Sequence, residues 1–299
     1  MNNGCICCTV RGDLIEILHR LLQRKDPLDA ILIETTGLAD PAPVAQTFFV
    51  DDFLQVDYAK KAWANKSSTF SSRFWFNTLV FMQARTKLDA IITIVDAKHI
   101  LQHLDEEKPE GVENESVEQI AFADRIILNK TDLVSQEELQ TVKGRIKSIN
   151  APVKIFETTH SKVDLEEVLG IGAFELDKVV EMDPGFLDVD QEHQHDSSVT
   201  SVGIECEGEC DIEKLEFWLS KLLREHGNDI FRSKGLLAIK GSPHRHVFQG
   251  VHMMLGMGSS ANGYGRPWAP QEKRLNRLVF IGRNLDREEL NSSFSKCID

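Results

Sequence analysis

The sequence predicts an α/β fold, in which a parallel sheet carries helices on both faces, followed by a smaller α+β domain. Three observations predict it. Short apolar runs typical of buried strands alternate with helical stretches up to residue 157. An acidic stretch without periodicity follows, and beyond it period-two strand patterns accompany one amphipathic helix. We therefore expect a first domain at 1–172, an acidic linker at 173–197 and a second domain at 198–299.

The first domain opens with a polar, glycine-containing loop over residues 1–12. Leucine and isoleucine then recur at helical spacing over 13–24, and Asp26-Pro27 ends this helix. Strands and helices alternate from there on, which predicts parallel strands joined by crossover helices. Buried strands are expected at 30–33, 90–95, 125–128 and 153–157, and helices at 112–123 and 137–150, with a turn or helix start after Pro41.

The second domain follows the linker and has a mixed pattern. Alternating or apolar runs predict strands at 199–206, 235–240, 247–253 and 277–282. Residues 212–225 (IEKLEFWLSKLLRE) have an apolar stripe at helical spacing and predict an amphipathic helix. Together these elements indicate a smaller α+β domain.

Residues 56–87 differ in composition from both neighbouring segments. They contain six basic residues against one acidic residue, with two tryptophans and four phenylalanines. A basic, aromatic block inside an acidic chain marks a composition shift. We interpret it as an insertion, and a partner-binding loop is the alternative.

Charge and hydropathy exclude several classes of function. The net charge of −13 argues against a nucleic-acid partner. The sequence contains no run of eighteen apolar residues, so we expect no membrane span. The start of the chain has neither the basic region nor the apolar core of a signal peptide. Three of the six cysteines lie within four positions, which is unlike a secreted disulfide framework. We expect a cytoplasmic protein and leave targeting to an organelle open, because any targeting segment could lie upstream of Met1.

Cys5, Cys7 and Cys8 lie in the sequence GCICC. Thiols at this density indicate a metal site or a redox site. Zinc prefers thiolate ligands in tetrahedral geometry, so three thiolates leave one position for water or a partner. Copper(I) and cobalt suit the same ligands. A disulfide between the adjacent Cys7 and Cys8 is strained, which makes a thiol oxidoreductase the weaker alternative.

Residues 129–132 read NKTD, the guanine-selecting tetrapeptide of GTP-binding proteins. The Asp132 carboxylate can accept two hydrogen bonds from the guanine edge that adenine does not offer. Asn129 would face the carbonyl side of the base, and the aliphatic stem of Lys130 would lie over the ring. The tetrapeptide follows the strand predicted at 125–128, and ligands bind at the carboxyl ends of parallel strands.

A second motif, ILIETTGLADP, occupies residues 31–41. With GCICC and NKTD it resembles the CobW-type family of GTP-dependent metal chaperones. The resemblance runs to about Leu290. Near its end, residues 273–286 match the closing signature of the family. It implies a P-loop-NTPase-like sheet and a CobW-type C-terminal domain.

The resemblance also implies roles for individual residues. Glu34 would hold Mg²⁺ by way of water, and the Gly37 N–H would meet the γ-phosphate of GTP. Residues close to the nucleotide would include Thr131 beside the base and, after the thiols, Thr9, Arg11 and Gly12. Zn²⁺ on the cysteines would pass to a client metalloprotein apoenzyme when GTP is hydrolysed, and the chaperone would be a GTP hydrolase able to form a homodimer.

One part of the family pattern is missing. A phosphate-binding loop of the form G-x-x-x-x-G-K-[ST] occurs nowhere in the 299 residues. In the family this loop lies on a first strand upstream of the cysteines, so we expect a chain truncated before the cysteine motif, with reduced nucleotide affinity. Two other functions therefore stay open. One is a zinc-binding module without nucleotide turnover, and the other is a cobalt chaperone of a cobalamin pathway.

The remaining histidines and cysteines carry weaker signals. His193 and His195 lie in the linker, where family members have a histidine-rich tract, and solvated histidines are the simpler interpretation. Cys206 and Cys210 have a spacing that could bind metal, although both are expected near a strand end. The histidines in 242–246 (SPHRH) are expected in a turn and have no assigned role.

Overall fold

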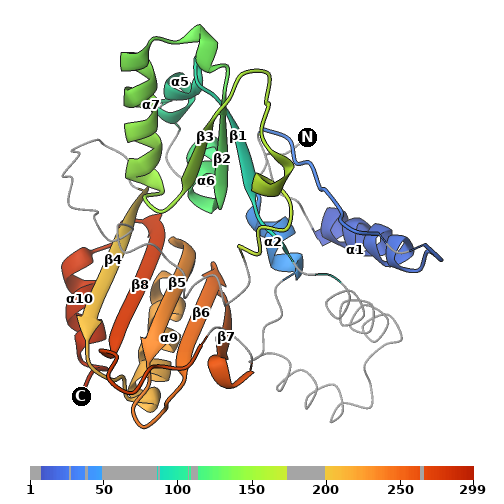
Figure 1. The fold of residues 1–299 in the computed structure, drawn as a ribbon. Coiled ribbons are helices and arrows are strands. Elements are labelled where there is room, and N and C mark those ends of the chain that lie inside the picture. Colours follow the sequence, from blue (N-terminus) through green and yellow to red (C-terminus); the bar gives the residue numbers. More distant parts are fainter. Residues whose placement is uncertain are drawn as a thin grey trace. The chain divides into compact units, whose positions relative to one another are not determined.

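The structure, a computed structural model, describes residues 8–26, 28–37, 40–48, 86, 88–106, 108, 114–173, 199–262 and 266–299 (Figure 1). The chain divides into two compact units, 1–88 and 89–299, and each is described by itself. Almost all of the 56–87 block and the linker with its two histidines lie outside the described residues. The interpretations of both segments stay predictions.

Two helices make up most of the described part of the first unit, α1 (Cys8–Leu22) and α2 (Ala42–Phe48). Ile15 and Leu18 of α1 are buried and pack with Ile31 and with Phe48 of α2. The expectation of a loop through residue 12 was wrong, because α1 begins at Cys8. A glycine inside a helix costs only about 1 kcal/mol relative to alanine, so Gly12 does not delay the helix start.

Residues 30–33 do not form the predicted buried strand. The side chains of Leu32 and Ile33 are 82% and 38% exposed. A strand is stable only beside a hydrogen-bonded neighbour, and the described residues of this unit contain no other strand. The apolar run alone was therefore an insufficient signal.

The second unit begins with a parallel sheet of order β1-β2-β3, formed by β1 (Ile92–Asp96), β2 (Arg125–Asn129) and β3 (Lys154–Glu157). All three strands were predicted. In the register, Asp96 pairs with Asn129 and Leu128 pairs with Glu157. The carboxyl ends of the strands therefore meet at one edge of the sheet, where ligands bind in α/β folds.

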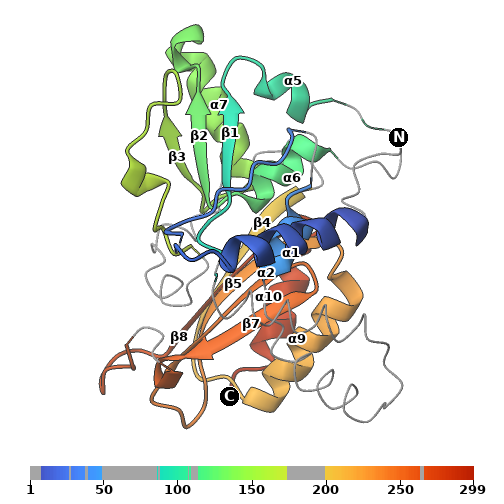
Figure 2. The same ribbon diagram turned by 90° about the vertical axis from the view of Figure 1, so that its right-hand side faces the viewer.

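Helices α5 (Ile100–Leu104), α6 (Glu115–Phe122) and α7 (Gln136–Ile149) pack against one another beside this sheet. Figure 2 shows the three strands side by side with α7 behind them. Right-handed crossovers in a monotonic strand order put α6 and α7 on the same face. Ile94 of β1 is 65% exposed. The parallel sheet with helices is thus confirmed, and helices over the second face stay a prediction.

Local sequence explains where these helices begin. The Asn114 side chain accepts hydrogen bonds from the backbone N–H groups of Ser116 and Val117 at the start of α6. Ser135 and Glu138 form a capping box at the start of α7. Such caps satisfy backbone donors that the first helical turn leaves free. Short 3₁₀ turns, η1 (Thr131–Leu133) and η2 (Leu165–Glu167), follow β2 and β3.

The C-terminal part is an antiparallel sheet of order β4-β8-β5-β6-β7 with two helices (Figure 1). Its elements are β4 (Val199–Glu207), α9 (Ile212–His226), β5 (Ile230–Ala238), β6 (Arg245–Val251), β7 (Met254–Ser259), the short η4 (Ser260–Asn262), β8 (Leu275–Arg283) and α10 (Arg287–Ser295). The sequence predicted α9 and four of the strands. It missed β7, which is glycine-rich, and α10, which buries only Leu290 and Phe294.

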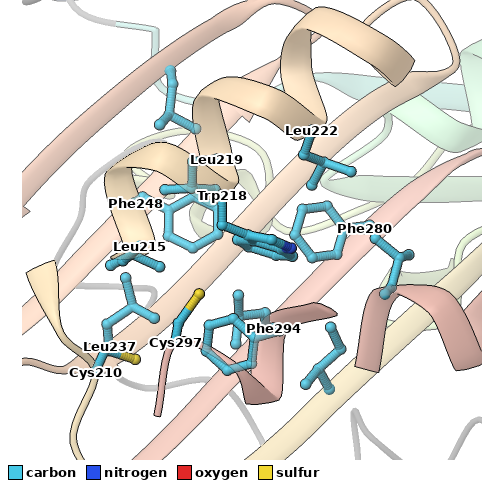
Figure 3. Packing of buried hydrophobic residues seen from close by; sticks show 14 of the residues in the cluster. Cys210, Leu215, Trp218, Leu219, Leu222, Leu237, Phe248, Phe280, Phe294 and Cys297 are labelled. Atoms are coloured by element: carbon cyan, nitrogen blue, oxygen red, sulfur yellow. The ribbon is translucent and has the colours of Figure 1, made fainter. Parts of the chain in front are cut away.

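The core of this part lies between the sheet and its helices. Trp218 of α9 packs edge-on against Phe280 of β8, with ring centroids 6.0 Å apart, and against Phe294 of α10 at 5.2 Å (Figure 3). The Trp218 Nε1–H donates to Ser293 Oγ at 2.9 Å, so the buried indole has a partner. These aromatic contacts attach both helices to the sheet.

Three free thiols belong to this region: Cys210 and Cys297 are buried in the core, and Cys206 is partly buried against it (Figure 3 labels the first two). The Cys210 Sγ–H donates to Asn276 Oδ1 at 3.3 Å. Burial raises the pKa of Cys210 to about 12 and that of Cys206 to about 11, and it also raises the pKa of Cys297. These thiols are packing groups at neutral pH, which does not support the metal site considered for Cys206 and Cys210.

Within the second unit the two sheets meet at a buried group of charges, the junction cluster of Asp124, Arg232 and Lys234. Asp124 Oδ1 accepts hydrogen bonds from Arg232 Nη2 at 2.6 Å and Lys234 Nζ at 3.3 Å. Arg232 Nη1 also donates to the Phe122 carbonyl at 2.7 Å. Burial opposes ionisation of Asp124, but the two cations and the Ile91 N–H outweigh it and lower its pKa.

Candidate functional site

The NKTD tetrapeptide lies at the carboxyl edge of the parallel sheet, as predicted. Asn129 is the last residue of β2, and its neighbours across the sheet are Asp96 at the end of β1 and the loop that follows β3. Residues 158–162 form that loop, which we call the β3 loop. The site is built from these three strand ends.

The side chain of Asn129 is held in one orientation by the β3 loop. Its Oδ1 accepts a hydrogen bond from the Ser161 N–H at 2.8 Å and one from Thr158 Oγ1 at 3.2 Å. His160 and Ser161 have φ values of 54° and 53°, in the left-handed region that few non-glycine residues adopt. These two residues turn the loop back onto Asn129.

The next two residues of the tetrapeptide are also fixed. Lys130 is left-handed, with φ 61° and ψ 33°, and its carbonyl accepts a hydrogen bond from the Leu133 N–H at 3.0 Å. The N–H and the hydroxyl of Thr131 both donate to the Thr158 carbonyl, at 3.3 and 3.0 Å. The backbone of the tetrapeptide is therefore tied to β3 as well as to β2.

Asp132 differs from its neighbours. Its side chain is exposed, and it makes no hydrogen bond or ion pair within the described residues. The carboxylate is thus free to accept two hydrogen bonds from a ligand, while the residues around it are held in place. A base that presents two adjacent N–H donors, as guanine does at N1 and N2, would match it.

A second carboxylate, Asp96, lies beside the tetrapeptide. Its Oδ2 accepts a hydrogen bond from Lys130 Nζ at 2.7 Å and lies 3.0 Å from His99 Nδ1, and its Oδ1 accepts one from the Lys98 N–H at 2.9 Å. Partial burial opposes ionisation, but these hydrogen bonds, that of Lys130 first, outweigh it and hold the pKa of Asp96 well below its usual range. Asp96 is therefore a carboxylate anion at neutral pH.

The sequence analysis did not assign a role to Asp96, Thr158 or Ser161. A usable signal was present in each case. Asp96 directly follows one predicted strand and the polar run TTHSK follows another, and a parallel sheet brings the residues after both strands to the same edge as NKTD. Chain order alone does not tell which strands are neighbours, and the sheet order of the structure supplies that information.

The residues implied by the family resemblance at the start of the chain belong to the first unit. Glu34 is exposed on an irregular segment, and a side chain at Gly37 would meet open space. The backbones of Cys8, Thr9, Arg11 and Gly12 lie in α1, and their side chains are outside the described ones. None of these placements tests a role in binding, so the roles stay predictions.

The other thiols of the metal motif, Cys5 and Cys7, lie outside the described residues. Among the residues that the structure does describe, no three histidine, cysteine or acidic side chains are grouped so as to hold a metal ion. In the same part of the chain, no helix is long and apolar enough to cross a bilayer.

Comparison with known protein families decides the identity of the chain. The model of the "CobW/HypB/UreG, nucleotide-binding domain" matches residues 1–63 and 67–157, and that of the "Cobalamin synthesis protein cobW C-terminal domain" matches residues 199–298. The chain belongs to the CobW family. The predicted family and the predicted fold class are both confirmed.

Other members of the CobW family have been named as metal chaperones. Zinc chaperone YjiA of Escherichia coli K12 is 32% identical over 99% of this chain and 80% of its own length. Zinc-regulated GTPase metalloprotein activator 1 of Schizosaccharomyces pombe is 31% identical over 96% of this chain and 68% of its own. Zinc chaperone CobW of Pseudomonas aeruginosa is 30% identical over 95% and 71%.

A solved structure agrees with this CobW-family fold. The crystal structure of Zn(II)-bound YjiA GTPase from E. coli superposes with a TM-score of 0.70 at 27% identity, covering 96% of this chain and 76% of that one. Both the parallel sheet and the C-terminal domain therefore have counterparts in a known GTPase.

Proposed function

We propose that this protein is a zinc chaperone whose handling of the metal is governed by a guanine nucleotide bound at residues 129–132. One observation carries the nucleotide part of the proposal. Asp132 is an exposed carboxylate without a partner among the described residues, next to an asparagine and a lysine that are held in place. This arrangement suits a guanine base.

Zn²⁺ is the cargo in this proposal, and Cys5, Cys7 and Cys8 are its ligands. Three thiolates bind zinc and leave the fourth tetrahedral position open. An open position lets a client metalloprotein place its own ligand on the metal before the chaperone releases it. The names of the relatives, two zinc chaperones and a metalloprotein activator, support this role.

The phosphates of the nucleotide have fewer candidate contacts in this sequence than the base has. The 299 residues contain no G-x-x-x-x-G-K-[ST] loop, whose backbone N–H groups and lysine would hold the β- and γ-phosphates. Glu34, expected to hold Mg²⁺, is exposed, and the described residues bring no further ligand to it. The base contacts at residues 129–132 therefore carry the nucleotide part of the proposal, and no described residue is assigned to hydrolysis.

A second candidate is a zinc-binding module without nucleotide turnover. It would keep the cysteine site and could use guanine nucleotide as a ligand that is not hydrolysed. Phosphate release from GTP, measured with and without zinc, separates the two functions. Turnover that depends on the protein supports the chaperone cycle, and guanine binding without turnover supports the module.

Calorimetric titration of nucleotide tests the site itself. GTP–Mg²⁺ and ATP–Mg²⁺ are titrated into zinc-loaded and zinc-free protein. The proposal expects binding of GTP, weaker binding of ATP, and a GTP affinity that changes with zinc, because linked sites alter each other's affinity reciprocally. Equal affinities for GTP and ATP would contradict it.

Asp132→Asn sharpens this test. Asparagine presents one donor and one acceptor, so it mismatches guanine and matches xanthine, whose position 2 is a carbonyl. We expect the variant to lose GDP binding and to gain binding of xanthosine diphosphate. A variant that melts like the wild type and still binds GDP with unchanged affinity would place base recognition elsewhere.

The metal part has a separate test. Competition with a chromogenic chelator gives the affinities for Zn²⁺ and Co²⁺ of the wild type and of the Cys5→Ser/Cys7→Ser/Cys8→Ser variant. Cys206→Ser, outside the motif, is the matched control. We expect only the triple variant to lose zinc, and a preference for cobalt would favour the cobalamin-pathway alternative. Sedimentation of the wild type and of the triple variant tests the homodimer that the family resemblance implies.

A further inference from the structure

Asp96 is placed by the sheet itself. It is the last residue of β1 and pairs in register with Asn129, the first residue of the tetrapeptide. The turn after it is fixed by the Ala97 N–H, which donates to the Asn129 carbonyl at 2.9 Å. The Asp96 carboxylate is therefore carried by the same strand pair that carries Asn129 and Lys130.

The orientation of this carboxylate is determined by groups of its own turn. The Lys98 N–H donates to Oδ1 at 2.9 Å, and His99 Nδ1 lies 3.0 Å from Oδ2. These two contacts do not involve the tetrapeptide. The Asp96 carboxylate, which accepts the hydrogen bond from Lys130, is thus oriented by contacts that do not depend on the lysine.

Lys130 is fixed at both ends. Its left-handed backbone sets the direction in which the side chain leaves the chain, and its Nζ donates to Asp96 Oδ2 at 2.7 Å. A lysine side chain is otherwise among the most mobile, since it has four rotatable bonds. Here half of the side chain is exposed, so packing does not immobilise it and the carboxylate does.

The electrostatic environment supports this interpretation. The nearest ionisable groups on the packed elements are His99 on the β1–α5 turn and Lys98, whose own Nζ lies 3.4 Å from Glu138 Oε1 of α7. Lys98 therefore has its own carboxylate and does not compete for Asp96. Lys130 is the lysine that the Asp96 carboxylate holds.

From this geometry we propose that Asp96 is a positioning residue for base recognition, which holds the Lys130 side chain in the direction it needs to cover the base. This inference rests on the proposed guanine site. A side chain that is already ordered loses less entropy when the ligand binds, and the gain appears as affinity. The proposed role of Asp96 is exercised through its hydrogen bond with Lys130.

The test measures binding of fluorescent GDP and of fluorescent ADP to four proteins: wild type, Asp96→Asn, Lys130→Ala and the double variant. Asparagine keeps the size of the side chain and removes its charge. We expect Asp96→Asn to weaken GDP binding about three- to tenfold, and ADP shows how far the effect depends on the base. In the Lys130→Ala background the same substitution should have no further effect.

Asp105→Asn is the matched control. Asp105 is an exposed aspartate that pairs with Arg145 at 3.4 Å and does not contact Lys130. It removes the same charge from the same unit, so it corrects for the change in overall field. Thermal melting of each variant checks that the fold is kept, and Asp96→Glu, which keeps the charge, tests for partial rescue.

The outcomes are distinguishable. If the wild type does not prefer GDP to ADP, the proposed function is overturned, and this inference with it. If the wild type prefers GDP and its affinity for GDP survives Asp96→Asn, only the inference is overturned. An equal loss with and without Lys130 would also overturn it, because Asp96 would then act by another route.

Discussion

Asp124 and Asp96 have similar partners in different surroundings. Each carboxylate lies within hydrogen-bonding distance of two basic side chains and accepts a hydrogen bond from one backbone N–H. The Asp124 side chain is 4% exposed and lies between two sheets, whereas that of Asp96 is 29% exposed at a sheet edge. Asp124 directly precedes β2, and Asp96 is the last residue of β1.

The difference between them shows that burial, more than the number of partners, decides what an ion cluster contributes. Removing one partner from a buried cluster leaves a charge that water cannot reach. Removing one from an exposed cluster lets water replace it at little cost. Asp124 can therefore serve stability, and Asp96 can serve the orientation of a neighbour without the fold depending on it.

Asp124→Ala should have the largest effect. It leaves Arg232, whose side chain is 5% exposed, without its carboxylate. We expect the free energy of unfolding to fall by about 3–5 kcal/mol, as measured by urea denaturation. Asp105→Ala, which removes a 63% exposed carboxylate from Arg145, is the control and should cost about 1 kcal/mol or less. Equal losses for the two variants would mean that the junction cluster is hydrated.

A double-mutant cycle tests whether Asp124 and Arg232 act as a pair. Asp124→Leu removes the carboxylate that Arg232 and Lys234 share, Arg232→Met leaves Asp124 with Lys234, and the double variant removes both members of the shorter pair. We expect the double variant to be more stable than the sum of the single losses predicts, with a coupling of about 2 kcal/mol. Additive losses would show that the two residues stabilise the junction independently.

Lys234 provides a pH dependence. Burial, reinforced by Arg232 and opposed by Asp124, lowers its pKa from 10.5 to about 8. Between pH 8 and 10.5 the unfolded chain then binds more protons at this group than the folded chain, so its contribution to stability rises with pH. Lys234→Met should remove up to about 1 kcal/mol per pH unit of this rise. Unfolding curves measured at several alkaline pH values check it, and parallel profiles would contradict it.

Asp96→Asn should have the smallest effect on stability. The cluster is partly exposed, and an exposed ion pair contributes about 1 kcal/mol or less. We expect the melting temperature to change by no more than a few degrees, while the affinity for guanine nucleotide changes as described above. A loss of stability as large as that of Asp124→Ala would make the two aspartates equivalent and remove the contrast.

The sequence was sufficient where pattern and motif agreed. The apolar runs before Asp96 and Asn129 and the run ending at Glu157 are strands, and the strand pattern placed NKTD at a carboxyl edge. In this fold a ligand-binding motif is expected directly after a buried parallel strand, so each of the two sequence signals supports the other. The domain boundaries at 172 and 198 and the cysteine ligands stay predictions.

It was insufficient where a feature depends on a neighbour that the sequence does not identify. Leu32 is apolar yet exposed, because hydrogen-bonded pairing and not apolarity makes a strand. Thr158 and Ser161 matter because β3 lies next to β2, and Asp124 matters because Arg232 comes from a different sheet. These are properties of spatial neighbours far apart along the chain.

The protonated thiols of the C-terminal core have a practical consequence for chemical labelling. The thiolate is the form that reacts with iodoacetamide, and the raised pKa values of Cys206, Cys210 and Cys297 keep that form scarce at neutral pH. In the native protein we expect these three thiols to add little to the alkylation signal. Loss of alkylation on adding zinc can therefore count, by mass spectrometry, how many of the predicted ligands Cys5, Cys7 and Cys8 the metal protects.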